Sequence, residues 1–573
     1  MSGDSRAAMT LPDLISVARG EKPADLVLAN ARVVNVFTSE IESANVAVLG
    51  DTIAGVGDYT QAREVLDLDG RFLAPGLIDG HTHPESSLLH IGQYAAAVVP
   101  RGTTSVVTDF HEMANVCGLE GLLYVRSAAR RLPLDLHFLM PSCVPATHLE
   151  TSGATLGPAE VRRALKWRGM LGLGEVMNFH SVLNRDAEML QKLEEARGRA
   201  MDGHSPGLSG RDLNAYLAAG PGSCHETTTF EQGREKLRRG MFLFIREGSS
   251  EKNLEALLPL VTDGSDSRCA FVVDDRSARD LLRDGDMDAV VRKAIALGLD
   301  PVRAVQLATI NPARHFNLGR VGAIGPGYRA NLAVLDDLAR FHVQRVFHRG
   351  RLVAEDGKPL FHAPAIHRSE VTQTVKVKPF TIADLALPAR GAAFPAIQVV
   401  PGQILTRRQD VEVTAVDGLI RPDVRRDILK AIVVERHRAS GNIGRGLATG
   451  FGLKRGALAS SVAHDSHNIV AVGASDEDIY VAIQEVIRLQ GGLVVAAGGK
   501  VWGSLALPVA GLLSPQPLAF VVSKLEGLEV LARELGCSLS SPFSTLSFLA
   551  LPVIPELRLT DKGLVDVASS RLI

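Results

Sequence analysis

The sequence of 573 residues lacks the features that mark secreted, membrane-spanning and nucleic-acid-binding proteins. Its five cysteines form no Cys-x-x-Cys pair, and their odd number argues against a disulfide framework. No apolar run approaches the roughly 18 residues of a membrane span. The formal net charge is only −2, which offers no electrostatic basis for binding nucleic acid. These absences predict a soluble protein of the reducing cytoplasm, with neither nucleic acid nor a membrane as its partner.

The apolar run from Phe72 to Ile78 leads into PGLIDGHTHPESS, which places His81 and His83 two residues apart at the end of a predicted strand. Side chains two apart on a strand share a face, so two imidazoles in this arrangement can hold one metal ion. A lone His-x-His pair is equally compatible with two ordinary surface or core histidines. Whether the pair binds metal or consists of two ordinary histidines therefore depends on the residues that follow in the chain.

Seven further apolar or β-branched runs follow, and each ends in polar, metal-competent or helix-starting residues. The predicted strand ends lie near residues 83, 111, 143, 177, 204, 225, 247 and 274. Their spacing of about 20 to 35 residues is the length that a strand-helix unit requires. Helical periodicity fills several gaps, at 191–200, 229–239 and 287–297. Eight such units predict an α/β fold with a (β/α)8 barrel over 76–321, whose chemistry lies at the C-terminal strand ends.

Six metal-competent residues lie at these predicted strand ends. They are His81, His83, Glu175, His204, His225 and Asp274. Singly, each has an ordinary alternative, since His204 could cap a helix and Asp274 could be the N-cap of the helix that follows it. Together, four imidazoles and two carboxylates at one barrel rim predict a site for two divalent cations, with one carboxylate bridging them.

The chain resembles the amidohydrolase superfamily, and within it the bacterial adenine deaminases, along nearly its whole length. The resemblance is carried by ordered segments that include PGLIDGHTHPESS (75–87), GLGEVMNF (172–179), DGHSPGLSGRDLNAY (202–216), HETTTFEQGREKLRRGM (225–241) and GNIGRGLATGFGL (441–453). It implies two metal ions, manganese or iron, and the hydrolysis of adenine to hypoxanthine and ammonia. It also implies that Glu175 bridges the metals and that Asp274, rather than Asp275, is the strand-eight ligand. The two aspartates are adjacent, and only one of them can face the metals.

The implied chemistry assigns roles to the two carboxylates. A hydroxide shared by two metals is a strong nucleophile, because coordination lowers the pKa of water from about 15.7 toward 7. It would add to C6 of the purine while Asp274 carries its proton to the leaving amine, which makes Asp274 and Glu175 the predicted catalytic residues. Ring nitrogens also need hydrogen-bond partners. Six residues just beyond strand ends could supply them: Glu85, Ser86, Asp109, His111, Glu112 and Arg276.

Two other functions stay open. A related hydrolase of a cyclic amide or an N-acyl bond would share the barrel, but such relatives usually carry a carboxylated lysine at strand four. Here Glu175 stands at that place, and Lys166 belongs to the preceding helix. A binding or scaffolding protein would be expected to have lost metal ligands, yet all six are present. Five positions near the predicted pocket depart from the family pattern: Phe110, His180, Val272, Val273 and Ser277.

The remaining chain is predicted to form three further parts. Residues 1–23 are expected to be a helical segment without the apolar core of a signal peptide. The β-rich segments 24–75 and 322–385 are expected to form one composite β-sandwich, which requires the two ends of the barrel to lie close together. A separate α/β or α+β domain is predicted for 390–573, with strands at 429–436, 468–473 and 492–499 and a helix at 476–489.

One cluster in the C-terminal part has two interpretations. His464-Asp465-Ser466-His467-Asn468 could be a second metal or acid-base site, or it could stabilise a tight loop. The family resemblance adds a third possibility, that the segment covers the pocket of the barrel or of a neighbouring subunit. No coiled coil or repeat bears on assembly, and a homodimer is the general expectation for an enzyme of this kind.

Overall fold

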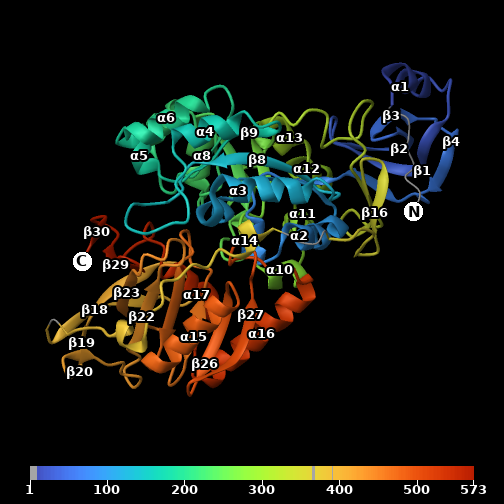
Figure 1. Ribbon diagram of the computed structural model, residues 1–573. Coiled ribbons are helices and arrows are strands. Elements are labelled where there is room, and N and C mark those ends of the chain that lie inside the picture. The colour runs from blue at the N-terminus through green and yellow to red at the C-terminus, as the bar shows by residue number, and fades with distance from the viewer. Residues whose placement is uncertain (1–8, 364–367, 390) are drawn as a thin grey trace.

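A computed structural model describes residues 9–363, 368–389 and 391–573 of the chain. Figure 1 shows three neighbouring regions: an N-terminal sheet, a central region of strands and surrounding helices, and a C-terminal sheet with its own helices. The central region contacts both of the others. Among the described residues, none of the helices combines the length and the apolarity that crossing a membrane requires.

Eight parallel strands form the central region in two sheets. The five-stranded sheet contains β6 (Leu77–Asp79), β7 (Thr103–Thr108), β8 (Asp135–Pro141), β9 (Met170–Val176) and β10 (Ala200–Gly203). The three-stranded sheet contains β11 (Ser223–Cys224), β12 (Phe242–Arg246) and β13 (Cys269–Val272). Backbone hydrogen bonds join the sheets, from Gly222 N to Met201 O at 2.9 Å and from Asp274 N to His81 O at 3.0 Å. The parallel strands therefore curl until the last one meets the end of the first, beside His81.

Helices follow most of these strands, as the predicted alternation requires. Their bounds are η1 (Pro84–Ser87), α2 (Ile91–Val98), η2 (Val99–Arg101), α3 (His111–Ala129), α4 (Pro158–Leu165), α5 (Phe179–Leu183), α6 (Ala187–Glu195), α7 (Gly210–Ala218), α8 (Phe230–Arg238), α9 (Leu254–Leu257), η3 (Leu258–Leu260), η4 (Asp266–Arg268), α10 (Ala278–Arg283), α11 (Met287–Ala296), α12 (Pro301–Leu307) and α13 (Ile310–His315). The helices expected at 229–239 and 287–297 are confirmed by α8 and α11. The helix expected at 191–200 was placed wrongly, because α6 ends at Glu195 and Ala200 already begins β10. Gly198, at φ 79°, turns the chain between them in a conformation that favours glycine.

The N-terminal sheet is built from both flanks of the central region. Its nine strands are β1 (Ala24–Asn35), β2 (Glu40–Leu49), β3 (Thr52–Gly57), β4 (Ala62–Asp67), β5 (Phe72–Pro75), β14 (Leu332–Leu335), β15 (Val343–His348), β16 (Arg351–Glu355) and β17 (Lys358–Pro359). β5 and β14 are antiparallel neighbours, with Leu73 opposite Val334. This pairing brings the two ends of the central region together. Helix α1 (Leu11–Ala18) packs on β3 and β2, and residues 1–8 of the expected helical segment lie outside the described residues.

The C-terminal part contains an eight-stranded sheet in the order β19-β18-β23-β22-β25-β24-β26-β27. The bounds of its elements are α14 (Ser369–Thr372), η5 (Ile382–Leu385), β18 (Ala393–Val399), β19 (Thr406–Glu412), β20 (Ala415–Val416), β21 (Leu419–Ile420), β22 (Leu429–Val434), β23 (Ile443–Thr449), β24 (Ala457–Ser460), β25 (Ile469–Gly473), α15 (Asp476–Arg488), β26 (Gly492–Ala497), β27 (Lys500–Ala506), α16 (Leu518–Glu534), α17 (Pro542–Phe548), β28 (Leu557–Thr560), β29 (Gly563–Asp566) and β30 (Arg571–Leu572). The three strands and the helix predicted here are confirmed by β22, β25, β26 and α15.

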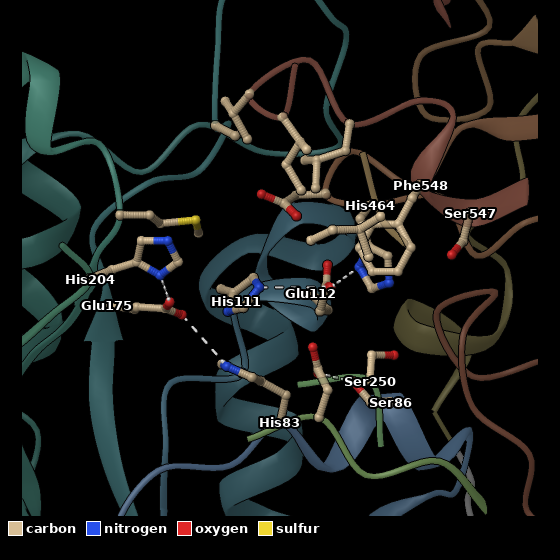
Figure 2. Close-up of a pocket in the computed structure, with 18 of the residues that line it drawn as sticks. His83, Ser86, His111, Glu112, Glu175, His204, Ser250, His464, Ser547 and Phe548 are labelled. Atoms are coloured by element: carbon tan, nitrogen blue, oxygen red, sulfur yellow. Dashed lines mark hydrogen bonds and ion pairs between the residues drawn. The ribbon is translucent and has the colours of Figure 1, made fainter. Parts of the chain in front are cut away.

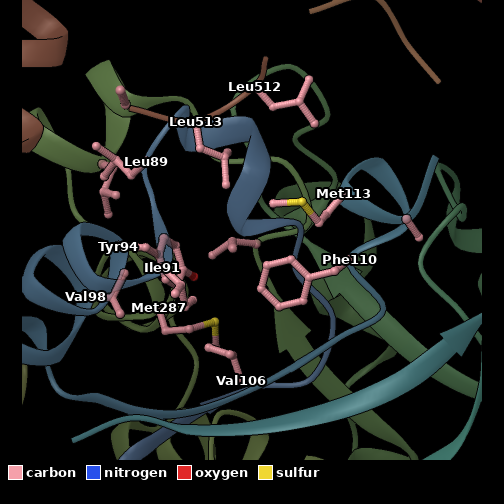
Figure 3. Close-up of a cluster of buried hydrophobic side chains, with 14 of the residues drawn as sticks. Leu89, Ile91, Tyr94, Val98, Val106, Phe110, Met113, Met287, Leu512 and Leu513 are labelled. Carbon is pink, nitrogen blue, oxygen red and sulfur yellow. The ribbon is translucent and has the colours of Figure 1, made fainter. Parts of the chain in front are cut away.

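Apolar packing and backbone pairing hold the C-terminal part against the central region. Figure 3 shows Leu512 and Leu513 in the same buried cluster as Leu89 and Met113. Burying one such side chain contributes about 1.5 to 3 kcal/mol. Ser514 N donates to Leu88 O at 2.7 Å, and Ser514 O accepts from His90 N at 2.8 Å. This contact follows directly after η1, and therefore lies beside the end of the first parallel strand.

Candidate active site

The six predicted metal ligands converge at the C-terminal ends of the parallel strands. His81 and His83 follow β6, His204 follows β10, His225 follows β11 and Asp274 follows β13, while Glu175 lies on β9. The Nε2 atoms of His81 and His83 are 3.1 Å apart. Asp274 Oδ1 lies 3.6 Å from His81 Nε2 and 3.2 Å from His83 Nε2. Residues up to 193 positions apart are thus neighbours, and five of the six are at most 5% exposed.

Glu175 lies between two groups of imidazoles. Its Oε1 lies 2.5 Å from His204 Nδ1 and 3.1 Å from His225 Nε2, and its Oε2 lies 3.5 Å from His83 Nε2. Figure 2 shows this carboxylate with His204 on one side and His83 on the other. Each carboxylate oxygen therefore faces a different set of possible ligands, as a bridging group requires.

The donor set fits divalent cations. Two ligands of one ion, each about 2.1 Å from it, lie roughly 3.0 to 3.4 Å apart, close to most of the separations found here. Asp202 Oδ2 accepts from His81 Nδ1 at 2.6 Å, which leaves Nε2 of a neutral His81 with its lone pair toward the cluster. Burial disfavours the charged form of His83, but the carboxylates around it, Asp274 and Glu175 among them, outweigh burial and raise the pKa of His83 to about 9. The negative charge of the cluster thus attracts cations, and a metal ion would compete with these protons.

Asp274 and Asp275 point in different directions. Asp274 faces His81 and His83, whereas Asp275 accepts a short hydrogen bond from Ser86 Oγ. The backbone of Asp274 is left-handed, at φ 59°, a conformation that aspartate tolerates better than most residues. The geometry therefore selects Asp274 as the aspartate of the cluster.

Arg246 was missed by the sequence analysis. It ends β12 and is 3% exposed, and its Nη1 lies 2.6 Å from Asp274 Oδ2 and 2.6 Å from Glu226 Oε1. Burial raises the pKa of Asp274, but Arg246 together with His81, His83 and His225 outweighs burial and holds that pKa well below its usual range. Arg246 thereby fixes one oxygen of Asp274 and leaves the other toward the histidines. Arg246 stands in the segment IREGSS, at a predicted strand end. That position could have indicated that its side chain reaches the site.

Replacing Arg246 should damage both stability and turnover. Arg246→Met leaves the buried carboxylate of Asp274 and the half-buried carboxylate of Glu226 without their cation, so we expect the free energy of unfolding to fall by about 3 to 5 kcal/mol. Denaturant unfolding measures this change, and kcat should fall as Asp274 loses its fixed orientation. Arg345→Met is the matched control, because Arg345 forms an ion pair with Glu355 in the N-terminal sheet. Its effect should stay within about 1 kcal/mol. Equal effects of the two substitutions would contradict the role given to Arg246.

A cavity of about 1260 Å³ opens over the cluster. Of the six predicted substrate contacts, Glu85, Ser86, His111 and Glu112 line this cavity. Asp109 lies behind the lining, where it accepts from Glu175 N at 3.2 Å and contacts His111 Nδ1 at 3.0 Å. Arg276 is not brought to the cavity, because its guanidinium donates to the carbonyls of Gly285 and Gly248, at 3.0 and 3.3 Å.

Of the five positions that depart from the family pattern, two line the cavity and three do not. His180 and Ser277 line the cavity, and Ser277 also caps α10 by accepting from Asp280 N. Phe110, Val272 and Val273 are buried in apolar packing and are not part of the lining. Only the first two can therefore change contacts to a ligand directly.

The His464 to Asn468 segment reaches the same cavity, which is lined by His464, Asp465 and His467. Glu112, at the start of α3, makes one short contact to His464 Nδ1 and another to His467 Nε2. Figure 2 shows His464 between Glu112 and Phe548, and the rings of His464 and Phe548 stack at 4.7 Å. Burial opposes the charge on His464, but Glu112 outweighs it and raises the pKa of His464 to about 9. The C-terminal part thus supplies one wall of the site.

Comparisons with known proteins agree with this architecture. Residues 72–353 match the model of the amidohydrolase family, and residues 403–571 match that of the adenine deaminase C-terminal domain. Together with the curled parallel sheet, these matches define the protein as a hydrolase of the amidohydrolase type.

Curated relatives narrow this class. An adenine deaminase of Dehalococcoides mccartyi is 58% identical over 98% of this chain and 99% of its own. Adenine deaminase 2 of Carboxydothermus hydrogenoformans is 48% identical, with 98% of each chain covered. An adenine deaminase of Methanothrix thermoacetophila is 46% identical, again with 98% of each covered. The chain belongs to the adenine deaminase family.

Proposed function

We propose that the protein hydrolyses adenine to hypoxanthine and ammonia in a binuclear metal site. The observation that carries this proposal is Glu175, whose two oxygens face separate groups of histidines at the end of β9. The names of relatives that match nearly the whole chain support adenine as the substrate.

The cations would be held by the predicted ligands. His81, His83 and Asp274 would bind one ion, His204 and His225 the other, and Glu175 both. The ligands are imidazoles and carboxylates without a thiolate, a set that suits Mn²⁺ or Fe²⁺. When bound, the two ions supply an acidified water and polarise the purine.

The protein's own groups handle the proton and the substrate. Asp274 would accept a proton and deliver it to the leaving amine, while Arg246 holds Oδ2 and fixes the orientation of the carboxylate. Burial of the cluster limits the access of bulk water, which strengthens these electrostatic contacts. His111 and Glu112 lie on the wall of the same cavity, where they can contact the purine.

We further propose that the eight parallel strands constitute a closed (β/α)8 barrel over 76–321. The hydrogen bonds at both seams between the two sheets support this closure. The flanking segments 24–75 and 322–385 would then form one domain, and 390–573 another. The pairing of β5 with β14 supports the first of these domains.

Cyclic amide hydrolysis is disfavoured by the residue at strand four. A carboxylated lysine would have to stand where Glu175 lies, whereas Lys166 follows the end of α4, before β9 begins. The geometry therefore supplies a carboxylate rather than a carbamate between the two histidine groups.

Metal analysis and a substrate panel test this function. Protein produced with manganese should carry about two metal ions per chain and release ammonia from adenine. Protein stripped with a chelator should lose this activity and regain it when manganese is restored. Metal-loaded protein that opens a cyclic amide but leaves 6-aminopurines unchanged would contradict the proposal.

A further inference from the structure

Asp465 belongs to the C-terminal part but lines the cavity over the metal-ligand cluster. It is 5% exposed, and its Oδ2 has no hydrogen-bond partner among the described residues. Buried polar atoms in folded proteins are almost always hydrogen-bonded, so an unpartnered oxygen in a cavity wall calls for an explanation. Glu112, His111 and Glu175 line the same cavity as Asp465, and their charges act on its carboxyl group.

The chain around Asp465 is held firmly from both sides. The neighbouring His464 and His467 contact the two oxygens of Glu112. Behind them, Ser466 O contacts His437 Nε2 at 2.7 Å, and Asn468 Nδ2 donates to Thr151 O at 2.9 Å. Asp465 is therefore presented to the cavity by a fixed backbone rather than by a loose loop.

Glu112, His464 and His467 form a hydrogen-bonded group, here called the clasp, rather than a third metal site. His467 Nδ1 accepts from Ala463 N at 3.1 Å, so the proton of a neutral His467 must be on Nε2. That Nε2–H points at Glu112 Oε2 and has no lone pair to offer a cation. The clasp joins α3 of the central region to the C-terminal part and leaves Asp465 as the group directed at a ligand.

We propose that Asp465 determines specificity by accepting a hydrogen bond from the ring N–H of a free purine base. This inference rests on the proposed function, which places the amine of the base at the metal-ligand cluster. Free adenine carries one N–H on its five-membered ring, and a nucleoside carries a sugar at N9 instead. A buried carboxylate that needs this N–H selects for the free base, because analogues without it leave the carboxylate unpaired.

The charge state of Asp465 is compatible with this role. Burial, together with Glu112, raises the pKa of Asp465 to about 6. The group is then mostly ionised at neutral pH and can accept. Phe548, stacked on His464, and Phe543 add apolar surface to the same wall, which suits the flat face of a base.

Kinetics of Asp465 variants test the inference. Asp465→Ala should lower kcat/KM for adenine about 10- to 150-fold, mainly through KM, while metal content and melting temperature stay near those of the parent. Asp465→Asn keeps one acceptor oxygen and should lose less. Glu150→Gln is the matched control, since Glu150 is an equally buried acid that feels the charge of Asp465 but does not line the cavity. It should change kcat/KM less than about threefold.

Inhibition by 9-methyladenine separates recognition from a structural role. This analogue lacks a ring N–H and leaves the parent's carboxylate unpaired, so its inhibition constant should stay the same or fall in Asp465→Ala, whereas binding of adenine weakens. Equal losses for adenine and 9-methyladenine, or an Asp465→Ala variant as active as Glu150→Gln, would overturn the inference. If the parent protein turned over no purine, that result would contradict the proposed function without yet testing the role of Asp465. The Asp465 variants would then be assayed on the substrate the panel identified, and an unchanged kcat/KM there would overturn the inference as well.

Discussion

Asp274→Asn should retain metal and lose about 10²- to 10⁴-fold of kcat for adenine, the range that a positioned proton-transfer group contributes. Asparagine has the same shape and keeps an oxygen toward His81 and His83, so the cluster should still bind cations. Its amide cannot accept the proton that must reach the leaving amine. It also removes the charge that pairs with Arg246. Steady-state kinetics with metal analysis of the same preparation measures both effects.

Asp275→Asn is the comparison for this variant. Asp275 is adjacent in sequence but contacts Ser86 instead of the cluster, so its replacement should cost far less turnover. If Asp274→Asn deaminates as fast as the parent, or if Asp275→Asn is the slower of the two, the proton-transfer role of Asp274 is wrong.

Glu175→Ala should remove the metal ions themselves. The carboxylate contacts His83, His204 and His225, so its loss takes a ligand from both groups at once and leaves their imidazoles without an anion between them. We expect metal content to fall from about two ions to less than about one per chain, and activity to fall to background. The melting temperature should also cease to depend on added manganese, because stabilisation by a ligand requires binding.

The control for this second variant is Glu120→Ala, an exposed acid on α3. It should keep its metal, its activity and its thermal response to manganese. A Glu175→Ala protein that still carries two ions would show that the histidines and Asp274 bind them without a bridging group.

The strand ends and the clustering of the six candidate ligands were predictable because both follow from local patterns. His81 and His83 are two residues apart just beyond the end of β6, and each later candidate ligand stands where an apolar run stops. Asp202 could have been found in the same way, because it is two residues before His204. The limit of helix α6 was less predictable, since the apolar pattern continued past Gly198 although the helix did not.

Contacts between distant elements were beyond the reach of local patterns. Arg246 meets Asp274 because β12 and β13 pair in a register that sets Arg246 opposite Val272, and sequence periodicity does not specify this register. His464 and His467 are three apart in a turn, and only the docking of the C-terminal part brings them to Glu112. The role of Asp465 depends on that docking as well.

The antiparallel pairing of β5 with β14 has a consequence for the folding pathway. Leu73 and Val334 lie opposite each other although the whole run of parallel strands separates them in the chain. Closing so long a loop costs entropy that no local contact repays, and non-local pairings of this kind slow folding. The N-terminal sheet can therefore be completed only late, once the intervening chain has become compact. A nascent polypeptide would have to wait for residue 335 to leave the ribosome before its first strands found all their neighbours.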